Sequence, residues 1–346
     1  MNISMIDFPH LPTHPPFSTK SRAAFIAAIL DVGYGNPTYG WRRADILVAG
    51  EINPDLILSD PDLAVNFGQR ETLVENATLT IGSSSAIFAC GAARLGLKVA
   101  LMGVVGDDFF GRYMLEALSG RQVDTSTALV DPEQKTGLSV ILSRGGDRAI
   151  ITHPGSMASL QADQVSDDLL RRSRHLHVAS YFLQTGLQPG LPDLFERAHA
   201  LGLTTSLDTN WDPSGAWRGV GDLLSRVDVF LPNEQEALAL TGEPDLESAA
   251  DRLSQRCRAV AIKLGERGAL ARQGDQVVRA PALPVSVADT VGAGDSFDAG
   301  FLYGYLNAWP LERSLRLAVA CGSLSTRLPG GTDGQPDLEE ALGAGA

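Results

Sequence analysis

Short apolar runs alternate with helix-patterned segments from Asp45 almost to the C-terminus, and this alternation limits the fold more than any other feature. Ser84–Gly96 and Asp107–Gly120 are examples of the helix-patterned segments. The apolar runs that we expect to form strands include "DILVAG", "KVALMGVVG", "HLHVAS", "TTSLDTN", "VDVFLPN" and "AVAIKLG". Parallel strands need long crossovers, which helices usually supply. The sequence therefore predicts an α/β fold with a central, mostly parallel sheet flanked by helices on both faces.

Two further β-patterned segments do not fit that central layer. "LVENATLTIG" (Leu73–Gly82) alternates in the manner of a half-exposed strand. Residues 137–152 contain two β-rich runs around "RGGD" (Arg144–Asp147), which predicts a hairpin. We assign both segments to a small β-sheet lid, contributed by residues 53–82 and 137–152 of a domain that covers residues 45–346.

Residues 1–44 differ in composition and pattern from the rest of the chain. They contain Pro9, Pro12, Pro15, Pro16 and Pro37 and no clear strand pattern. We interpret them as an N-terminal extension, a coil with one short helix over residues 20–31. It is either a loose arm or a docking segment for a second subunit, and we favour the arm because chain ends usually order only when tied down.

Charge and cysteine usage limit the partners and the compartment. A net charge of −13 disfavours binding to nucleic acid or to an anionic membrane surface. The three cysteines are far apart and include no CxxC pair, which suits a reducing cytoplasm and argues against a disulfide framework or a thiolate zinc site. No run of about 18 apolar residues predicts a membrane span. "AAFIAAIL" (Ala23–Leu30) is short and lacks a suitable cleavage site, so we predict no signal peptide and a cytoplasmic location.

"VSVADTVGAGDSFDAG" is the most informative stretch for function. It passes from an apolar run through Gly292, Ala293 and Gly294 into a helix. A glycine-rich turn at a helix N-terminus presents free backbone N–H groups and suits a phosphate. Asp295 follows at once, where a carboxylate would repel that phosphate. Its position is explained if Asp295 takes the proton of an attacking hydroxyl while the amides hold the transferred group. The alternative is that Asp295 only caps the helix.

Three other segments place polar residues where predicted strands end. Asn233 and Glu236 lie three residues apart, so both could organise a hydrated magnesium ion. They could equally form a capping box, which on the spacing alone is favoured. Asp208 and Asn210 end one strand, at the edge where open α/β sheets bind ligands. Lys263, Gly265 and Gly268 end another, in a turn that suits a nucleotide. His175 and His177 alternate along a strand and are interpreted as structural.

Together these segments resemble the ribokinase-like (PfkB) family of carbohydrate kinases. The resemblance runs from about Asp45 to Glu340. "DTVGAGDSFDAGF" is similar to the C-terminal signature of that family, and "PNEQEA" to its N-x-x-E magnesium motif. "KLGERGA" resembles a nucleotide-contacting turn, and "GEINPDLIL" resembles the first strand with its N-x-D sugar contact. The resemblance implies ATP-dependent phosphorylation of a hydroxyl group, with Mg²⁺ as cofactor.

The resemblance also implies roles for individual residues. Asp295 would be the catalytic base and the three residues before it the anion hole, while Asn233 and Glu236 would organise Mg²⁺ through water. A monovalent cation such as K⁺ would bind at Asp289, the Val291 carbonyl and the loop at residues 330–334. The lid would exclude water, so that ATP is not simply hydrolysed. The ATP-binding residues would be Asp208, Asn210, Lys263, Gly265 and Gly268, and the sugar contacts Asn53 and Asp55.

One departure from the family pattern bears on the acceptor. The family's G-G-x-x-x-N segment is here "IGSSSAIFA", with Gly82 in place and Ile87 where the asparagine would fall. No lysine stands in this segment, although a phosphorylated sugar would need a cation there. We therefore expect a neutral sugar or polyol, with hydroxyl contacts from Gly82, Ser84, Ser85 and Asp147.

Two alternatives remain open. A nucleoside kinase would use Phe88, Tyr181 and Phe182 as an aromatic wall, although these rings could also be core. A catalytically inactive member that binds only a ligand or partner is supported by the lost asparagine, but it has no use for Asp295. We also predict a small-molecule substrate beside ATP and a homodimer formed through the lid.

Overall fold

The computed structural model describes residues 44–144 and 147–345, and it contains an eight-stranded sheet, a four-stranded sheet and a two-stranded sheet. The predicted N-terminal extension therefore lies outside the described residues. The strand order of the large sheet is β14-β13-β12-β11-β10-β9-β1-β4. Its strands are β1 (Ile46–Ala49), β4 (Val99–Met102), β9 (His175–Val178), β10 (Thr204–Leu207), β11 (Val229–Phe230), β12 (Ala259–Lys263), β13 (Ala269–Gln273) and β14 (Gln276–Ala280).

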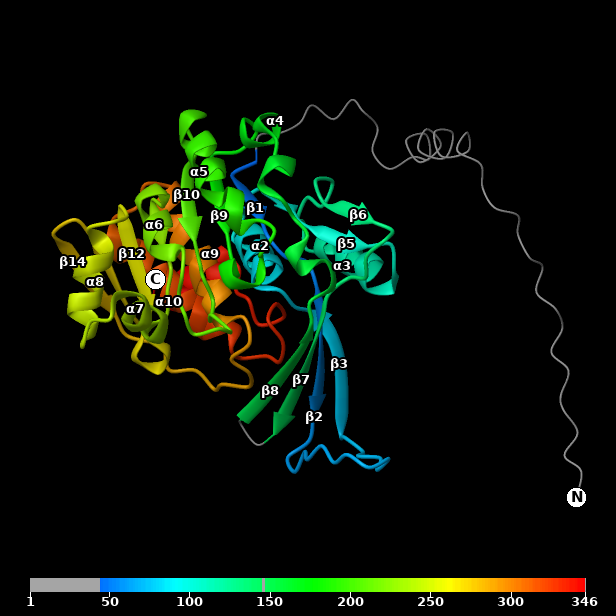
Figure 1. Ribbon diagram of the computed structural model, residues 1–346. Coiled ribbons are helices and arrows are strands. Elements are labelled where there is room, and N and C mark those ends of the chain that lie inside the picture. The colour runs from blue at the N-terminus through cyan, green and yellow to red at the C-terminus, as the bar shows by residue number, and fades with distance from the viewer. Residues whose placement is uncertain (1–43, 145–146, 346) are drawn as a thin grey trace, which may run out of the picture. The chain divides into compact units, whose positions relative to one another are not determined.

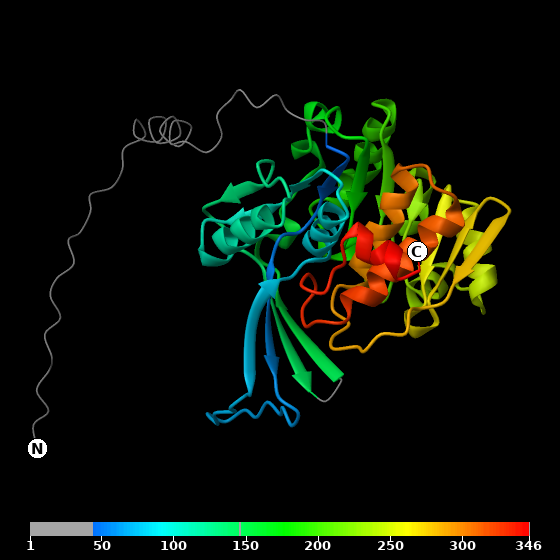
Figure 2. The same cartoon turned by 180° about the vertical axis from the view of Figure 1, so that it is seen from behind.

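The large sheet is parallel from β4 to β12 and antiparallel only at β13 and β14. This confirms the predicted α/β architecture. The short parallel strands are buried along almost their whole length because helices cover both of their faces. Figures 1 and 2 show the two helix layers on opposite faces of the sheet. The helices are α2 (Ser84–Arg94), α3 (Phe109–Gly120), α4 (Asp167–Leu170), α5 (Leu191–Ala200), α6 (Val220–Leu223), α7 (Glu234–Thr241), α8 (Leu246–Ser254), α9 (Ala293–Leu306), α10 (Leu311–Ser325) and α11 (Leu338–Gly343).

The sheet separates two hydrophobic cores. On one face, residues of α2, α9 and α10 pack around Phe88 and Phe301. On the other, residues of α5, α7 and α8 pack around Phe195 and Phe230. Burial of this size on both faces fixes the strand ends in space, which is what a site built from strand ends requires.

The four-stranded sheet is the predicted lid. Its order is β3-β2-β7-β8, with β2 at Pro54–Ser59, β3 at Asn76–Ile81, β7 at Leu138–Arg144 and β8 at Asp147–His153. In Figure 1 this lid sheet extends away from the large sheet. The paired residues Ile57, Ile141 and Ile150 form one apolar row across three of its strands. Asp55, Ser139 and Thr152 form the next row on the same side, so this side of the lid carries both apolar and polar groups.

Two expectations about strands need correction. The run Lys98–Gly106 is not one strand, because the chain bends at Gly103 and continues as β5 (Val104–Gly106). β5 pairs with β6 (Leu129–Asp131) in a separate two-stranded sheet. The strand expected from Leu73 begins only at Asn76, since the three residues before it remain in the loop that precedes β3. The antiparallel hairpin of β13 and β14 was not anticipated.

Candidate active site

The carboxyl ends of five neighbouring parallel strands supply most of the polar residues of the candidate site. Glu51 follows β1, Ser180 follows β9, Asp208 follows β10, Asn233 follows β11, and Lys263 is the last residue of β12. Parallel strands bring these ends to one edge of the sheet, where ligands of open α/β sheets bind. The predicted residues Asp208, Asn233 and Lys263 are therefore brought together by the topology itself.

The glycine-rich turn reaches the same edge from α9. Gly292 is the N-cap and has φ +71°, a left-handed backbone that glycine adopts without strain. A Cβ atom there would lie 2.7 Å from Gly331 Cα and 2.8 Å from Ile87 Cγ2, so the close approach of these segments also requires glycine. Ala293 and Gly294 begin the helix, and no side chain caps it. The first backbone N–H groups of α9 are thus left without intrahelical partners.

Asp295 lies in the first turn of α9 and is 8% exposed. Burial, together with the neighbouring Asp208 and Glu51, raises the pKa of its carboxyl to about 8, although Lys263 and the Ser84 hydroxyl oppose the shift. The side chain is not the helix N-cap, because Gly292 occupies that position. Asp295 is therefore a buried carboxyl with a pKa in the range where proton transfer at neutral pH is efficient.

A buried charge cluster of Lys263, Asp208 and Asp298 lies beside the glycine turn. Lys263 Nζ lies 2.8 Å from Asp208 Oδ2 and 3.2 Å from both carboxyl oxygens of Asp298. Burial lowers the pKa of Lys263, but the carboxylates of Asp208 and Asp298 raise it more, so the ammonium stays charged. A Cβ atom on Gly294 would lie 3.6 Å from Nζ, which places this ammonium directly beside the turn.

The two carboxyls of this cluster differ in protonation. Burial raises the pKa of Asp208, but its attraction to Lys263 and its hydrogen bond with Asp298 lower the pKa overall. Burial raises the pKa of Asp298 well above its ordinary value, and Lys263 offsets only part of this. Asp208 is thus shifted toward its ionised form, and Asp298 toward its protonated form.

Asn233 and Glu236 form the capping box that their spacing predicts. The Asn233 backbone N–H donates to Glu236 Oε2 at 2.8 Å, and the Glu236 N–H donates to Asn233 Oδ1 at 2.9 Å. Asn233 Nδ2 also donates to Glu236 Oε1 at 2.7 Å. Burial and the nearby Asp208 raise the pKa of Glu236 to about 7, while Lys263 of the charge cluster opposes the shift.

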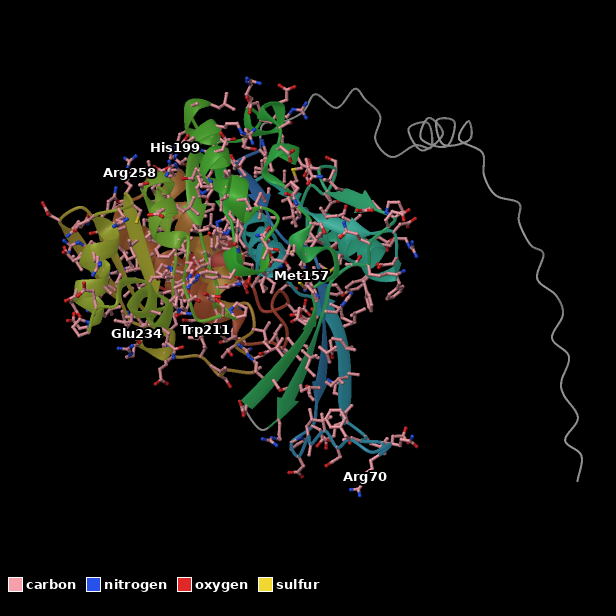
Figure 3. All side chains as sticks on the ribbon, in the orientation of Figure 1. Arg70, Met157, His199, Trp211, Glu234 and Arg258 are labelled. Carbon is pink, nitrogen blue, oxygen red and sulfur yellow. The ribbon has the colours of Figure 1, made fainter. Side chains whose placement is uncertain are left out.

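A cleft between the lid sheet and the large sheet is lined by Asp295 and by predicted acceptor contacts, and the part formed by Asn53 and Asp55 is called its acceptor end. Its lining includes Asn53, Asp55, Ser84, Asn210 and Gly292. Figure 3 labels Met157, another lining residue, where the lid sheet joins the rest of the domain. Asp295, the glycine turn and the lid residues therefore face one common space.

The acceptor end of the cleft is rich in buried oxygen atoms. Asn53 Oδ1 is buried and has no hydrogen-bond partner among the described residues. Burial and the neighbouring Glu51 raise the pKa of Asp55 to about 7, while Arg148 opposes the shift. Gly82 leaves room for this carboxyl, because a Cβ atom there would lie 2.1 Å from Asp55 Oδ1. These groups can exchange hydrogen bonds with hydroxyls of a bound molecule.

The predicted monovalent-cation loop is held together by Asp289. Asp289 Oδ1 accepts from the Val291 N–H at 3.0 Å, and Oδ2 accepts from the Gly330 N–H at 2.9 Å. The two segments predicted to share a cation are therefore adjacent. Within the described part of the chain, no group of three or more His, Cys, Asp or Glu side chains has an arrangement suited to a metal ion.

Other predicted residues lie away from the cleft. Asp147 begins β8 and lines a different pocket, with Leu63 and Ala149. Ser85 is fully buried, does not line the cleft, and donates to Glu51 Oε2 at 2.8 Å. Gly265 and Gly268 bound the turn that follows β12, and neither of them lines the cleft.

The sequence analysis did not select four polar residues that the structure places at the site. Glu51 is 2% exposed and lies between Asp55 and Asp295 in the cleft. Asp298 could have been found, because three residues after Asp295 is the same face of a helix. Ser180 follows a buried strand end, as Asp208 does. Arg148 lies on an exposed strand, and nothing in its local sequence connects it with the cleft.

Comparison with known proteins agrees with this geometry. Residues 43–338 match the model of the pfkB family of carbohydrate kinases. The chain belongs to this family. An uncharacterised sugar kinase of Archaeoglobus fulgidus is 32% identical over 258 residues, which are 71% of this chain and 98% of the relative. A fructokinase of Klebsiella pneumoniae is 32% identical over 285 residues, which are 75% and 91% of the two chains.

Solved structures share the fold. A ribokinase from Arabidopsis thaliana, solved with ribose and ATP, has a TM-score of 0.74 at 22% identity over 87% of this chain and 98% of its own. A ribokinase II-like protein from E. coli, solved with ATP and Mg²⁺, has a TM-score of 0.78 at 23% identity over 87% and 98%.

Family membership decides the reaction class. The protein is an ATP-dependent carbohydrate kinase, and this confirms the predicted family, fold class and enzyme class. In the described ranges, no helix has the length and apolar character that crossing a membrane demands.

Proposed function

We propose that the protein transfers the terminal phosphoryl group of ATP to a hydroxyl of a small neutral sugar or polyol, with Asp295 as the general base. The observation that carries this proposal is the position of Asp295, buried in the first turn of α9 between the glycine turn and the acceptor end of the cleft. A base must lie within reach of the hydroxyl that loses its proton, and the phosphoryl group must meet free donors.

The reaction follows from this placement. The acceptor oxygen forms a bond to the terminal phosphorus, the bond from that phosphorus to the bridging oxygen breaks, and ADP leaves. The acceptor proton passes to Asp295. The backbone N–H groups at Gly292, Ala293 and Gly294 would receive the negative charge of the transferred group, although that of Ala293 also makes a long hydrogen bond of 3.4 Å to the Thr290 carbonyl. The ammonium of Lys263 beside Gly294 adds a fixed positive charge.

Magnesium fits the edge formed by β11 and β12. Asn233 and Glu236 would hold the ion through its water molecules, since both carry the oxygen atoms that it prefers. When bound, the ion would neutralise charge on the ATP phosphates. We propose further that K⁺ binds where Asp289 joins the Val291 and Gly330 segments, and that replacing K⁺ by Na⁺ lowers the rate.

A neutral acceptor is supported by the charges of the cleft. Three carboxyls, those of Glu51, Asp55 and Asp295, line it against one cation, Arg148. An anionic acceptor would be repelled by those carboxyls that are ionised. A nucleoside is less well supported, because none of the rings proposed as an aromatic wall lines the cleft. Phe88 stacks on His177 at 3.9 Å in the core, and Phe182 packs against Tyr181 and Trp217.

The test is ADP release from ATP and Mg²⁺ across a panel of sugars, polyols and nucleosides, with Asp295→Asn beside the wild type. We expect turnover with one neutral sugar or polyol and a loss of about 10²–10⁴-fold in the variant. Asp275→Asn, in an exposed turn, is the matched control. Because Asp295 must be ionised to accept a proton, kcat/KM should fall as the pH falls below about 8. Equal rates in Asp295→Asn and wild type would refute the base.

We also propose that a second copy of the chain binds at the lid. β8 is the outermost strand of the lid sheet, and Ile150 and Ile151 on it are 57% and 60% exposed. An open strand edge with exposed apolar residues is a surface that pairs readily. Light scattering of wild type and of Ile151→Lys would show a dimer that the substitution dissociates. A monomeric wild type would refute the proposal.

A further inference from the structure

The side chain of Asn210 connects two serine hydroxyls at the floor of the cleft. Asn210 Nδ2 lies 2.6 Å from Ser84 Oγ and 2.8 Å from Ser180 Oγ. An amide nitrogen carries two hydrogens and accepts none. Both hydrogens are therefore donated, one to each serine oxygen. Each hydroxyl keeps a single hydrogen of its own, which it must direct at a different acceptor.

Each of those hydroxyls has a carboxyl beside it. Ser180 Oγ lies 2.8 Å from Glu51 Oε1 and donates to it. The Ser84 hydroxyl interacts with the carboxyl of Asp295 and favours its ionised form. The result is a continuous chain from Glu51 through Ser180, Asn210 and Ser84 to Asp295. Its members come from five segments that are far apart in the sequence, so the folded domain alone assembles it.

The backbone of Asn210 is specialised for this position. Its φ is +52°, in the left-handed region where asparagine is tolerated better than most residues. Its own N–H donates to Asp208 Oδ1 at 3.0 Å. The residue is thus fixed at both ends, by the carboxylate that pairs with Lys263 and by the two serines. A side chain held in this way keeps its donors aimed in constant directions.

We infer that Asn210 is a positioning residue for the base, which turns the Ser84 hydroxyl toward Asp295 and the Ser180 hydroxyl toward Glu51 by donating both of its amide hydrogens. This inference rests on the proposed function and replaces the predicted role of Asn210 as an ATP contact. A contact to phosphate would need a free amide hydrogen, and both are already engaged. With one side of the Asp295 carboxyl held by Ser84, its other oxygen is left for the acceptor hydroxyl.

Several charged groups around Asp295 contribute to its pKa, and therefore to the pH dependence of kcat/KM. Asp208 and Glu51 approach it from the strand ends and oppose its ionisation, and Asp298 lies on its own helix. Lys263 approaches from β12 and favours ionisation, as the Ser84 hydroxyl does. Asp55 and Arg148 face the same cleft from the lid. Losing the Ser84 donor, while these charges remain, moves the ionisation of Asp295 to higher pH.

The experiment compares Asn210→Gly and Ser84→Ala with wild type. Glycine retains the left-handed backbone and removes only the amide, and Ser84 is not the cap of α2, which is Ser83. In both variants the acid limb of the kcat/KM profile should move up by roughly half a pH unit to one unit. We expect kcat to fall by about tenfold and the KM for ATP to change less than about threefold. The double variant should move the limb no further than either single change, because the amide of Asn210 acts on Asp295 through the Ser84 hydroxyl.

Three outcomes would overturn the inference: an unmoved acid limb in both variants, additive shifts in the double variant, or a KM for ATP raised more than tenfold in Asn210→Gly. Asn307→Gly, at the exposed C-terminus of α9, is the matched control and should leave the profile unchanged. If Asn210→Gly does not fold, as judged by circular dichroism, the acid limb of the kcat/KM profile of Ser84→Ala decides whether the inference holds.

A readout without turnover separates this inference from the proposed function. The difference in unfolding free energy between the wild type and Asp295→Asn should decline as the pH rises from about 4 and level off near pH 8, because the folded pKa is about 8 and the unfolded value is ordinary. In the Ser84→Ala background, the levelling should occur at higher pH. An enzyme with no acceptor in the panel but with this shift would retain the inference and lose the proposed acceptor class. The same levelling point in both backgrounds would refute the inference.

Discussion

Replacing Lys263 by methionine tests whether the buried charge cluster is held together by its single cation. The variant keeps much of the side-chain volume and removes the ammonium that lies 2.8 Å from Asp208 and 3.2 Å from Asp298. Both carboxyls are almost fully buried. Removing one partner of a buried ion pair costs about 3–5 kcal/mol, because the remaining charge loses its counter-charge without regaining water. We expect a loss of unfolding free energy in this range near neutral pH.

The pH dependence of that loss has a definite sign. In the wild type Lys263 helps to keep the pKa of Asp208 low, so the ionised carboxylate contributes stability above its ordinary pKa. Without the ammonium, burial dominates and the pKa of Asp208 rises. The folded variant then binds more protons than the unfolded chain, and its stability falls as the pH rises. The deficit relative to wild type should therefore be larger at pH 8 than at pH 5.

The assay is urea unfolding followed by tryptophan fluorescence at both pH values. The double variant Lys263→Met/Asp208→Asn removes both charges and should recover about 2–3 kcal/mol relative to the sum of the single changes. Lys98→Met, at an exposed position, is the control and should stay within about 0.5 kcal/mol of wild type. A deficit below about 1 kcal/mol at pH 8, or simple additivity in the double variant, would refute the reasoning.

Three further predictions follow from the site. Gly292→Ala places a Cβ atom 2.7 Å from Gly331 Cα at a left-handed position, so it should destabilise the protein by about 1–2 kcal/mol, which thermal melting measures. It should also lower kcat more than it changes the KM for ATP, which steady-state kinetics measure. Glu236→Gln should raise the Mg²⁺ concentration for half-maximal rate by about tenfold. An unchanged Mg²⁺ titration would mean that Asn233 and Glu236 only cap the helix. Asp55→Asn should raise the KM for the acceptor by about tenfold with ATP unaffected, and because the pKa of Asp55 is about 7, the wild-type acceptor KM should vary with pH near 7 and the variant's should not.

Much of the fold could be predicted because the residues within each of these elements show a pattern typical of a strand or a helix. β1 and β12 are continuous apolar runs, and α9 follows a glycine turn that marks its start. The pairing of Asn233 with Glu236 is also local, since both residues lie in one helical turn. The division of the run Lys98–Gly106 into β4 and β5 at Gly103 could not be predicted from a local pattern. It depends on the close approach of Gly50 and Ile52, which precede it by some fifty residues.

The same distinction applies to the site. Asp295, Asp208 and Lys263 stand at strand ends or at the helix start, which topology alone brings together. The orientation of Asn210 depends on Ser84 and Ser180, and no local pattern relates these three. Asp147 was expected to contact a hydroxyl of the acceptor, yet it begins β8 at the end of the hairpin remote from the large sheet (Figure 1).

Two of the four connections between the lid and the rest of the domain have a mechanical consequence. The chain leaves β1 for the lid through Glu51 and Asn53, and it returns from β3 to α2 through Gly82 and Ser83. The Ser83 hydroxyl donates to the Glu51 carbonyl at 2.6 Å, so the outgoing and returning segments are clamped together. We therefore expect a tilt of the lid to act on the start of α2, and with it on the Ser84 hydroxyl beside Asp295. An acceptor that does not seat the lid well would then also leave the base poorly oriented.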